Sequence, residues 1–353
     1  MNLINVITRM LRALKSPQNR TNSKRHVACE FVYAESLIST QGRFRIADFT
    51  QLHFMYRWFC QASEMTTFMK FVYFLLLFFS VSLSLSAQEP IPIWPENSPR
   101  KARKVTVKPY IAESSDVAII VCPGGSYFWL DYGNEGEEVG RWMQQHGISA
   151  FVLKYRVPSW WAWFFHYRYI FRGKQHPDMY NDGQMALQWV HEHADEYGID
   201  RNKIGMIGFS AGGHLVMSEA CFRGKYRPAF VAPIYPVVTM SDKCVHKRSR
   251  RGLMGEYKRF NKEMRDSLSL EKHIPADCPP VFIANCKDDP IVHYHNSELL
   301  DSALTQHGIP HKYLQYKTGG HGFAVSEVKG SDEARVWRDE FLAWLKEIKI
   351  TKE

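Results

Sequence analysis

The sequence predicts an α/β fold, in which a mostly parallel central sheet is flanked by helices. Two observations support this prediction. Short apolar segments typical of buried strands alternate with segments of helical pattern along most of the chain. The polar residues that could carry chemistry follow directly after those apolar segments, at the strand ends where open α/β sheets place their sites. Segment 88–353 has the length of one such domain.

The expected elements follow a simple order. Strands are expected where apolar residues gather in short runs, over 116–122, 150–155, 203–209, 280–284 and 312–316. Helices are expected over 135–145, from Asn181 onward, and over 211–221, 296–307 and 332–348. Asn181 is the expected N-cap of its helix, because it opens a capping-box pattern. Aromatic and aliphatic residues at helical spacing predict the last helix.

Residues 208–212 read Gly-Phe-Ser-Ala-Gly, which is the pattern G-x-S-x-G. They lie between an expected strand and an expected helix, and this is the context of a nucleophile elbow. The tight turn would expose the hydroxyl of Ser210 at the helix N-terminus, where developing negative charge is stabilised. The alternative interpretation is a helix-starting turn in which Ser210 is an ordinary N-cap.

Candidates for an acid and a base follow Ser210 in the chain order Ser, Asp, His that an α/β-hydrolase requires. Asp288 and Asp289 come after the strand expected at 280–284, and His321 stands between glycines after the strand expected at 312–316. Asp289 is the preferred acid because it stands three residues before Val292, and Asp288 is then a solvated or capping neighbour. The alternative is that either loop is an ordinary polar turn.

A glycine-containing loop follows the first expected strand and reads Pro-Gly-Gly-Ser-Tyr over 123–127. Glycines in such a loop allow backbone N–H groups to point at a tetrahedral oxyanion. We expect the donors to be the N–H groups of Gly125, Ser126 and Ala211. A plain Gly-Gly turn is the alternative.

Four segments together resemble bacterial secreted α/β-hydrolases: Cys-Pro-Gly-Gly-Ser-Tyr, Phe-Val-Leu-Lys-Tyr-Arg-Val-Pro, Gly-Phe-Ser-Ala-Gly-Gly-His and Asp-Pro-Ile-Val. The most similar group is the acetyl-xylan-esterase and feruloyl-esterase-like branch, often labelled xylanase B-like. The resemblance implies an α/β-hydrolase fold with Ser210 as nucleophile, Asp289 as acid and His321 as base. The family loop usually has Gly where this chain has Ser126, which is one departure from the pattern.

The expected function is therefore serine carboxylester hydrolysis, with a small acyl group, acetyl first, removed from a small-molecule or polysaccharide ester. No cofactor and no metal are expected. A feruloyl or aryl esterase is one alternative. A serine exopeptidase of the prolyl-oligopeptidase kind is another, although such enzymes usually carry a propeller for which residues 88–115 are too few. A non-catalytic binding relative is disfavoured by the complete set of three residues. The sequence does not indicate the oligomeric state.

The N-terminal part of the chain does not read as part of the enzyme. Segment 69–87 has a basic start, an apolar core and small residues at its end, which is typical of a secretory signal peptide. A secreted or periplasmic location is therefore expected, without a stable membrane span in the mature form. Segment 1–68 is expected to be non-native or disordered. The alternative is a cytoplasmic tail followed by a signal anchor.

Charge and cysteine content exclude some classes of function. Residues 1–87 hold ten of the 45 Lys and Arg residues and four of the 36 Asp and Glu residues, so segment 88–353 has a net charge of about +3. This gives no reason to expect a nucleic-acid partner. Five cysteines remain in that segment, with no metal-binding spacing among them. An oxidising compartment would permit a disulfide such as Cys244–Cys278, but no spacing predicts it.

An aromatic insertion over 158–171 separates the strand at 150–155 from the helix at Asn181. It is expected to form a short cap, packed mainly upon itself, with membrane association as an alternative. The candidate substrate-binding residues are Trp160 and Trp161 in this insertion and Tyr127 in the glycine loop, since aromatic faces suit sugar rings. The basic run over 243–265 is expected to be a solvated excursion.

Overall fold

The structure is a computed structural model that describes residues 89–113, 115–158 and 175–351. These residues belong to one compact unit, Gln88–Glu353. The expected N-terminal segments 1–68 and 69–87 lie outside the described residues, as do Trp160 and Trp161 of the aromatic insertion.

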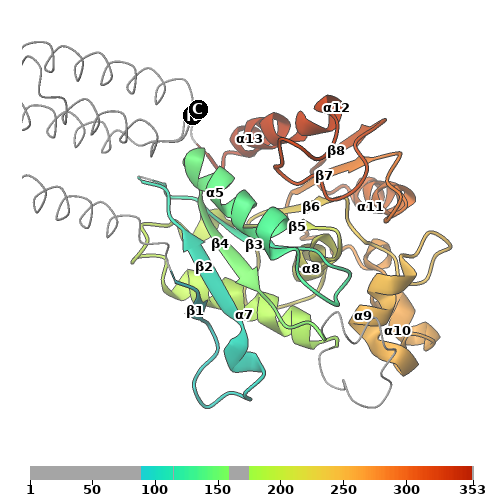
Figure 1. Ribbon diagram of the computed structural model, residues 1–353, viewed down its shortest axis with the longest axis horizontal. Helices are drawn as coiled ribbons and strands as arrows, with labels where there is room; N and C mark the ends of the chain where they lie inside the picture. Colours follow the sequence, from blue (N-terminus) through green and yellow to red (C-terminus); the bar gives the residue numbers. More distant parts are fainter. Residues whose placement is uncertain (1–88, 114, 159–174, 352–353) are drawn as a thin grey trace, which may run out of the picture. The chain divides into compact units, whose positions relative to one another are not determined.

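A sheet with the strand order β1-β2-β4-β3-β5-β6-β7-β8 forms the centre of this unit (Figure 1). β2 pairs antiparallel with β1 and β4, and the pairs from β4 to β8 are all parallel. The carboxyl ends of the parallel strands therefore lie at the same end of the sheet. The strands are β1 (Ile91–Pro92), β2 (Thr106–Tyr110), β3 (Ala118–Cys122), β4 (Ser149–Lys154), β5 (Ile204–Phe209), β6 (Val231–Ile234), β7 (Val281–Cys286) and β8 (His311–Tyr316).

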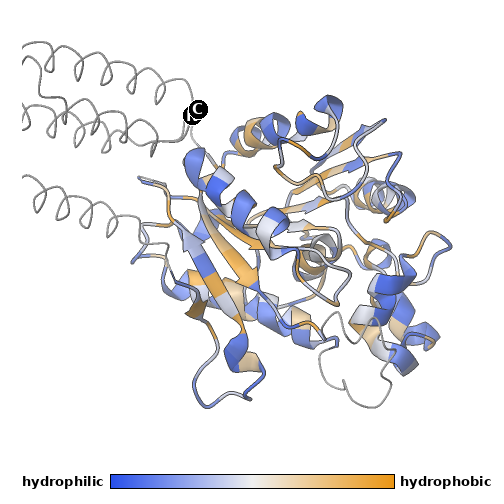
Figure 2. Cartoon of the chain, in the orientation of Figure 1, coloured by the Kyte–Doolittle hydropathy of each residue, from blue (hydrophilic) through white to orange (hydrophobic). Residues whose placement is uncertain are grey.

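Helices cover both faces of the sheet. One apolar cluster includes side chains of α7 (Asp178–Glu192), α8 (Ala211–Cys221) and α11 (His295–Gln306). The other includes side chains of α5 (Glu138–Gln145), α12 (Asp332–Arg335) and α13 (Trp337–Glu347). Successive residues of β3 enter the two clusters in turn, because strand side chains point to opposite faces. Figure 2 shows the hydrophobic central strands between helices that are largely hydrophilic.

The remaining elements lie in the connections. They are η1 (Ala102–Lys104), η2 (Tyr132–Glu137), η3 (Arg201–Lys203), α9 (Lys247–Lys258), α10 (Lys262–Ser267) and η4 (Leu270–Lys272). η2 is a π-helix that runs directly into α5. α9, α10 and η4 all lie between β6 and β7.

The strand predictions for β3, β4, β5, β7 and β8 are confirmed within two residues at each end. The N-cap prediction is wrong, because α7 begins at Asp178 and Asn181 lies inside its first turn. An interaction distant in sequence explains the difference. Arg156, just after β4, donates to the carboxylates of Asp178 and Asp182 at 3.0 and 2.9 Å, and this fixes the first turn of the helix earlier than the local pattern indicates.

The basic run over 243–265 also differs from the expectation of a solvated excursion. It forms α9 and α10, and the side chain of Arg251 is buried. The guanidinium of Arg251 lies 4.8 Å from the centroid of the Phe128 ring, and its Nε is 3.0 Å from Oε1 of Glu256. A buried arginine is tolerated here because a carboxylate neutralises it and an aromatic face covers it.

Three further observations concern the cysteines, the length of the helices and the metal-binding side chains. All five cysteines of the described residues are free, so the disulfide Cys244–Cys278 is not formed. No helix in the ranges that the structure describes is both long enough and apolar enough to cross a membrane. Within those same ranges, no cluster of three or more His, Cys, Asp or Glu side chains could hold a metal ion.

Candidate active site

Ser210 lies at the sharp turn between β5 and α8. Its backbone has φ 54° and ψ −115°, in a region that side chains other than glycine rarely adopt. A Cβ at Gly208 would lie 2.1 Å from the carbonyl oxygen of Gly212, and a Cβ at Gly212 would lie 2.0 Å from that of Cys122. Both positions therefore require glycine. The turn holds Ser210 at the N-terminus of α8, where the helix dipole favours negative charge.

A chain of hydrogen bonds joins Ser210 to two loops at the ends of β7 and β8. Oγ of Ser210 lies 2.9 Å from Nε2 of His321, and Nδ1 of His321 lies 2.6 Å from Oδ2 of Asp289. The carboxylate can only accept, so Nδ1 carries the proton and Nε2 is left to accept from the serine hydroxyl. The side chain of Asp289 is 1% exposed, and its other oxygen accepts from the N–H groups of Ile291 and Val292.

The structure gives the neighbouring aspartate a different position. Oδ1 and Oδ2 of Asp288 accept from the backbone N–H groups of Gly320 and Gly319, at 2.8 and 3.2 Å. Asp288 thus holds the backbone of the loop whose imidazole Asp289 binds. Of the two candidates for the acid, Asp289 is the one in contact with His321.

The glycine loop after β3 packs directly against the Ser210 turn. A Cβ at Gly124 would lie 2.9 Å from Cβ of Ser210. Gly125, Ser126 and Tyr127 follow with φ of 130°, 56° and 61°. In the described part of the chain, the backbone N–H groups of Gly125 and Ser126 donate to no other backbone group, and Ala211 begins α8, where the first N–H groups have no acceptor within the helix. The arrangement leaves these three donors free beside the serine, as an oxyanion-binding site requires.

Glu135, in η2, connects the glycine loop to the histidine loop. Its Oε2 accepts from the N–H of Gly124 at 2.7 Å, and its Oε1 accepts from the hydroxyl of Tyr235 at 2.9 Å. The Tyr235 ring packs on the imidazole of His321, with centroids 4.6 Å apart. The Tyr235 hydroxyl also accepts from the N–H of Ala324 at 3.2 Å. One buried carboxylate therefore supports both sides of the site.

The environment of Glu135 works against its charge. Burial raises the pKa of Glu135 to about 7, although nearby His321 and the two hydrogen bonds lower it and Asp131 adds to the rise. The sequence around Glu135 is rich in acidic residues and reads like a solvated helix start, so it contains no signal for this role.

Tyr127 differs from the expectation of a substrate-binding residue. Its side chain is 1% exposed, and its hydroxyl donates to Nδ1 of His214 at 2.8 Å. Nε2 of His214 in turn donates to the carbonyl oxygen of Leu268 at 3.0 Å. Burial lowers the pKa of His214 to about 4, so the imidazole is neutral at pH 7. Tyr127 points into the protein because its left-handed backbone turns the side chain towards α8, and it holds the loop in place.

The pKa of Glu135 makes a prediction about stability. An unfolded glutamate releases its proton near pH 4.5, whereas folded Glu135 keeps it up to about pH 7. Its contribution to stability is therefore fully present below pH 4.5 and is lost as the pH rises through 7. The free energy of unfolding of the native protein, relative to that of Glu135→Gln, should fall by about 3 kcal/mol between pH 4.5 and pH 8.

Urea denaturation of both proteins at several pH values measures this difference. Glu340→Gln is a matched control, since Glu340 of α13 is partly exposed and pairs with Lys312 of β8. A difference between native protein and Glu135→Gln that does not change with pH would contradict the prediction.

Comparison with known proteins agrees with the fold. Residues 142–304 match the family model described as BD-FAE. The chain is 29% identical over 247 residues to an acetylxylan esterase of Xylanibacter ruminicola, a match that covers 67% of this chain and 46% of that protein. It is 30% identical over 220 residues to an endo-1,4-beta-xylanase B of Butyrivibrio fibrisolvens, a match that covers 59% of this chain and 32% of that protein. The chain thus spans less than half the length of these two relatives.

A solved structure gives a fuller match. The acetyl ester-xyloside bifunctional hydrolase of Caldicellulosiruptor lactoaceticus is 29% identical, with a TM-score of 0.64, over 74% of this chain and 97% of that one. The strand order, the helices on both faces of the sheet and these similarities all indicate the same fold. The chain has the α/β-hydrolase fold, and its residues 142–304 are similar to the BD-FAE family.

Proposed function

We propose that the protein is a serine carboxylester hydrolase that removes small acyl groups, acetyl foremost, from carbohydrate. The observation that carries the proposal is the hydrogen-bonded chain from Ser210 through His321 to Asp289 at the turn between β5 and α8. In such a chain the imidazole serves as general base and the carboxylate orients it and stabilises its cationic form.

Acylation follows from this geometry. Nε2 of His321 takes the hydroxyl proton as Oγ of Ser210 attacks the ester carbonyl carbon, and the carbonyl oxygen becomes an oxyanion. The free N–H groups of Gly125, Ser126 and Ala211 stabilise that charge, together with the N-terminus of α8. When the tetrahedral intermediate collapses, the bond to the alcohol breaks, and His321 gives its proton to the departing alcohol.

Deacylation repeats these steps with water. His321 takes a proton from a water molecule, whose oxygen attacks the acyl carbon bound to Ser210. The second tetrahedral intermediate uses the same donors. Its collapse releases the carboxylic acid and returns the proton to Oγ of Ser210. The buried, paired state of Asp289 stabilises the imidazolium that exists in both intermediates.

The proposal for the substrate rests on similarity. Two of the relatives described above are named as acting on acetyl esters, an acetylxylan esterase and an acetyl ester-xyloside hydrolase. The match to the second protein covers 97% of that protein's chain. Small acyl groups on a xylan-like carbohydrate are therefore the first substrates to test.

We also propose that residues 69–87 act as a signal peptide and that the mature enzyme is 88–353. The sequence of that segment supports this, and so does the compact unit that begins at Gln88.

The roles of the three residues can be separated by substitution. Ser210→Ala and His321→Ala should each lower kcat on p-nitrophenyl acetate by about 10³-fold or more, because each removes an essential step of acyl transfer. Asp289→Asn should lower it far more than Asp288→Asn, since only Asp289 contacts the imidazole. Circular dichroism checks that the variants fold. Full activity in folded Ser210→Ala would refute the hydrolase proposal. A larger loss of kcat in Asp288→Asn than in Asp289→Asn would assign the role of the acid to Asp288.

Acyl-chain length tests the substrate proposal. The value of kcat/KM should fall from p-nitrophenyl acetate to butyrate to octanoate, since each badly fitting methylene costs roughly 1–3 kcal/mol. Acetylated xylan should release acetate faster than a feruloyl ester releases ferulate. A preference for octanoate would indicate a lipase-like enzyme, and faster ferulate release would indicate an aryl esterase.

The processing proposal predicts the N-terminus of the secreted protein. Mass spectrometry of material exported from a bacterial host should find a chain that begins near Gln88. A mature protein that retains residues upstream of Met69 would contradict it.

A further inference from the structure

Two consecutive residues of the glycine loop adopt an unfavourable backbone conformation. Ser126 and Tyr127 have φ of 56° and 61°, in the left-handed region that only glycine enters readily. Such a conformation persists only where surrounding contacts enforce it. Tyr127 is held through its hydroxyl by His214 of α8. The conformation of Ser126 therefore needs a stabilising contact of its own.

The helix α9 supplies this contact, because it touches both the side chain and the backbone of Ser126. Nε of Arg248 donates to Oγ of Ser126 at 3.0 Å. The Arg248 guanidinium also lies 5.3 Å from the centroid of the Trp129 ring, which restricts its plane. One turn later, α9 approaches so closely that a Cβ at Gly252 would lie 2.4 Å from the carbonyl oxygen of Ser126.

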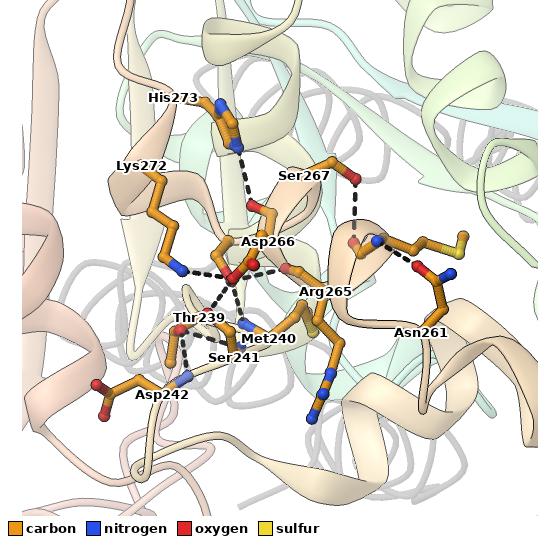
Figure 3. A network of polar contacts seen from close by, with 12 residues as sticks. Thr239, Met240, Ser241, Asp242, Asn261, Arg265, Asp266, Ser267, Lys272 and His273 are labelled. Atoms are coloured by element: carbon orange, nitrogen blue, oxygen red, sulfur yellow. Dashed lines mark hydrogen bonds and ion pairs between the residues drawn. The ribbon is translucent and has the colours of Figure 1, made fainter.

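α9 is itself tied to the frame of the site. Arg250 donates to the carbonyl oxygen of Met240 at 3.1 Å, and the N–H of Met240 donates to Oγ of Ser269 at 3.0 Å. Ser269 donates in turn to the carbonyl oxygen of Arg265 at 2.8 Å. Figure 3 shows the polar network around this segment, which joins α10 to the stretch after β6.

The stretch after β6 also touches the nucleophile. The N–H of Val237 donates to the carbonyl oxygen of Ser210 at 3.1 Å. The bond from Arg250 to Met240 thus ties α9 to the same stretch that binds the backbone of Ser210. A side chain projected from α9 onto Ser126 can therefore set the position of the loop relative to the nucleophile.

We propose that Arg248 is a positioning residue that holds the backbone N–H of Ser126 in place for the oxyanion by binding the Ser126 hydroxyl. This rests on the proposed esterase function. The proposal also explains why this chain has Ser126 where the loop of the similar family usually has glycine, because a glycine would give Arg248 no hydroxyl to bind. Arg248 acts through Ser126, so its effect should depend on the serine side chain.

A double-mutant cycle tests this dependence. Arg248→Met and Ser126→Ala should each lower kcat on p-nitrophenyl acetate about tenfold and change KM less than twofold, because the donor is misplaced rather than removed. The double variant should be no slower than either single variant. Lys247→Met is the control, since Lys247 is exposed on the same helix, and its kcat should equal that of the native enzyme.

A second measurement does not depend on turnover. Amide hydrogen exchange of a peptide covering 124–129 should be faster in Arg248→Met and Ser126→Ala than in the native protein and Lys247→Met, since the loop loses a contact. If the two losses in kcat multiply in the double variant, Arg248 acts on the substrate or independently, and the proposal is wrong. If the exchange of this peptide is the same in the variants as in the native protein, the proposal for Arg248 is wrong, whether or not the protein is an esterase. If the exchange is faster in the variants but the native protein hydrolyses no ester, only the proposed function is wrong.

Discussion

The close passage of three backbone segments is the constraint on which this site depends. The carbonyl group of Cys122, the turn at Ser210 and the first residues of α8 approach so closely that Gly208 and Gly212 have no room for a Cβ. A Cβ at Gly124 would likewise lie 2.6 Å from the carbonyl oxygen of Phe209, the residue before Ser210. Because these contacts are backbone on backbone, the nucleophile and the free N–H groups have a fixed separation before any substrate arrives. Such preorganisation is the main source of electrostatic stabilisation in acyl transfer.

His321 is held by the opposite means. Its loop contains glycines with φ of 144°, 64° and 74° at 319, 320 and 322, and a chain so rich in glycine has little conformational preference of its own. Contacts from outside supply the order: Asp288 binds the backbone of the loop, and Asp289 binds the imidazole. On the other side, Tyr235 packs on the ring and Asn134 donates to the carbonyl oxygen of Gly322 at 3.0 Å.

The sequence predicted the parts of this molecule whose physics is local. A buried parallel strand such as β3 or β5 is a continuous apolar run, and polar groups at parallel strand ends follow from the fold class. The sequence could therefore predict that Ser210, Asp289 and His321 meet, and hydrogen bonds join them. The strand β2 could not be predicted, since Lys108 and Pro109 interrupt its apolar pattern and its pairing with β1 and β4 makes it a strand. α9 was missed because its charges look solvated, although Arg251 is buried against Phe128. Glu135 was missed because what distinguishes it, burial between two loops, is set by tertiary packing alone.

The order of the sheet has a consequence for synthesis of the chain. Ser210 follows β5, whereas Asp289 and His321 follow β7 and β8, and β8 is the last strand of the described sheet at its edge. A nascent chain can pair β3, β4 and β5 and form the serine turn while the segment that carries His321 is still inside the ribosome. Until β8 joins the edge, no imidazole reaches the serine. If the protein has the proposed esterase activity, the growing polypeptide therefore stays inactive, and the first hydrolysis would report that the C-terminal edge has docked.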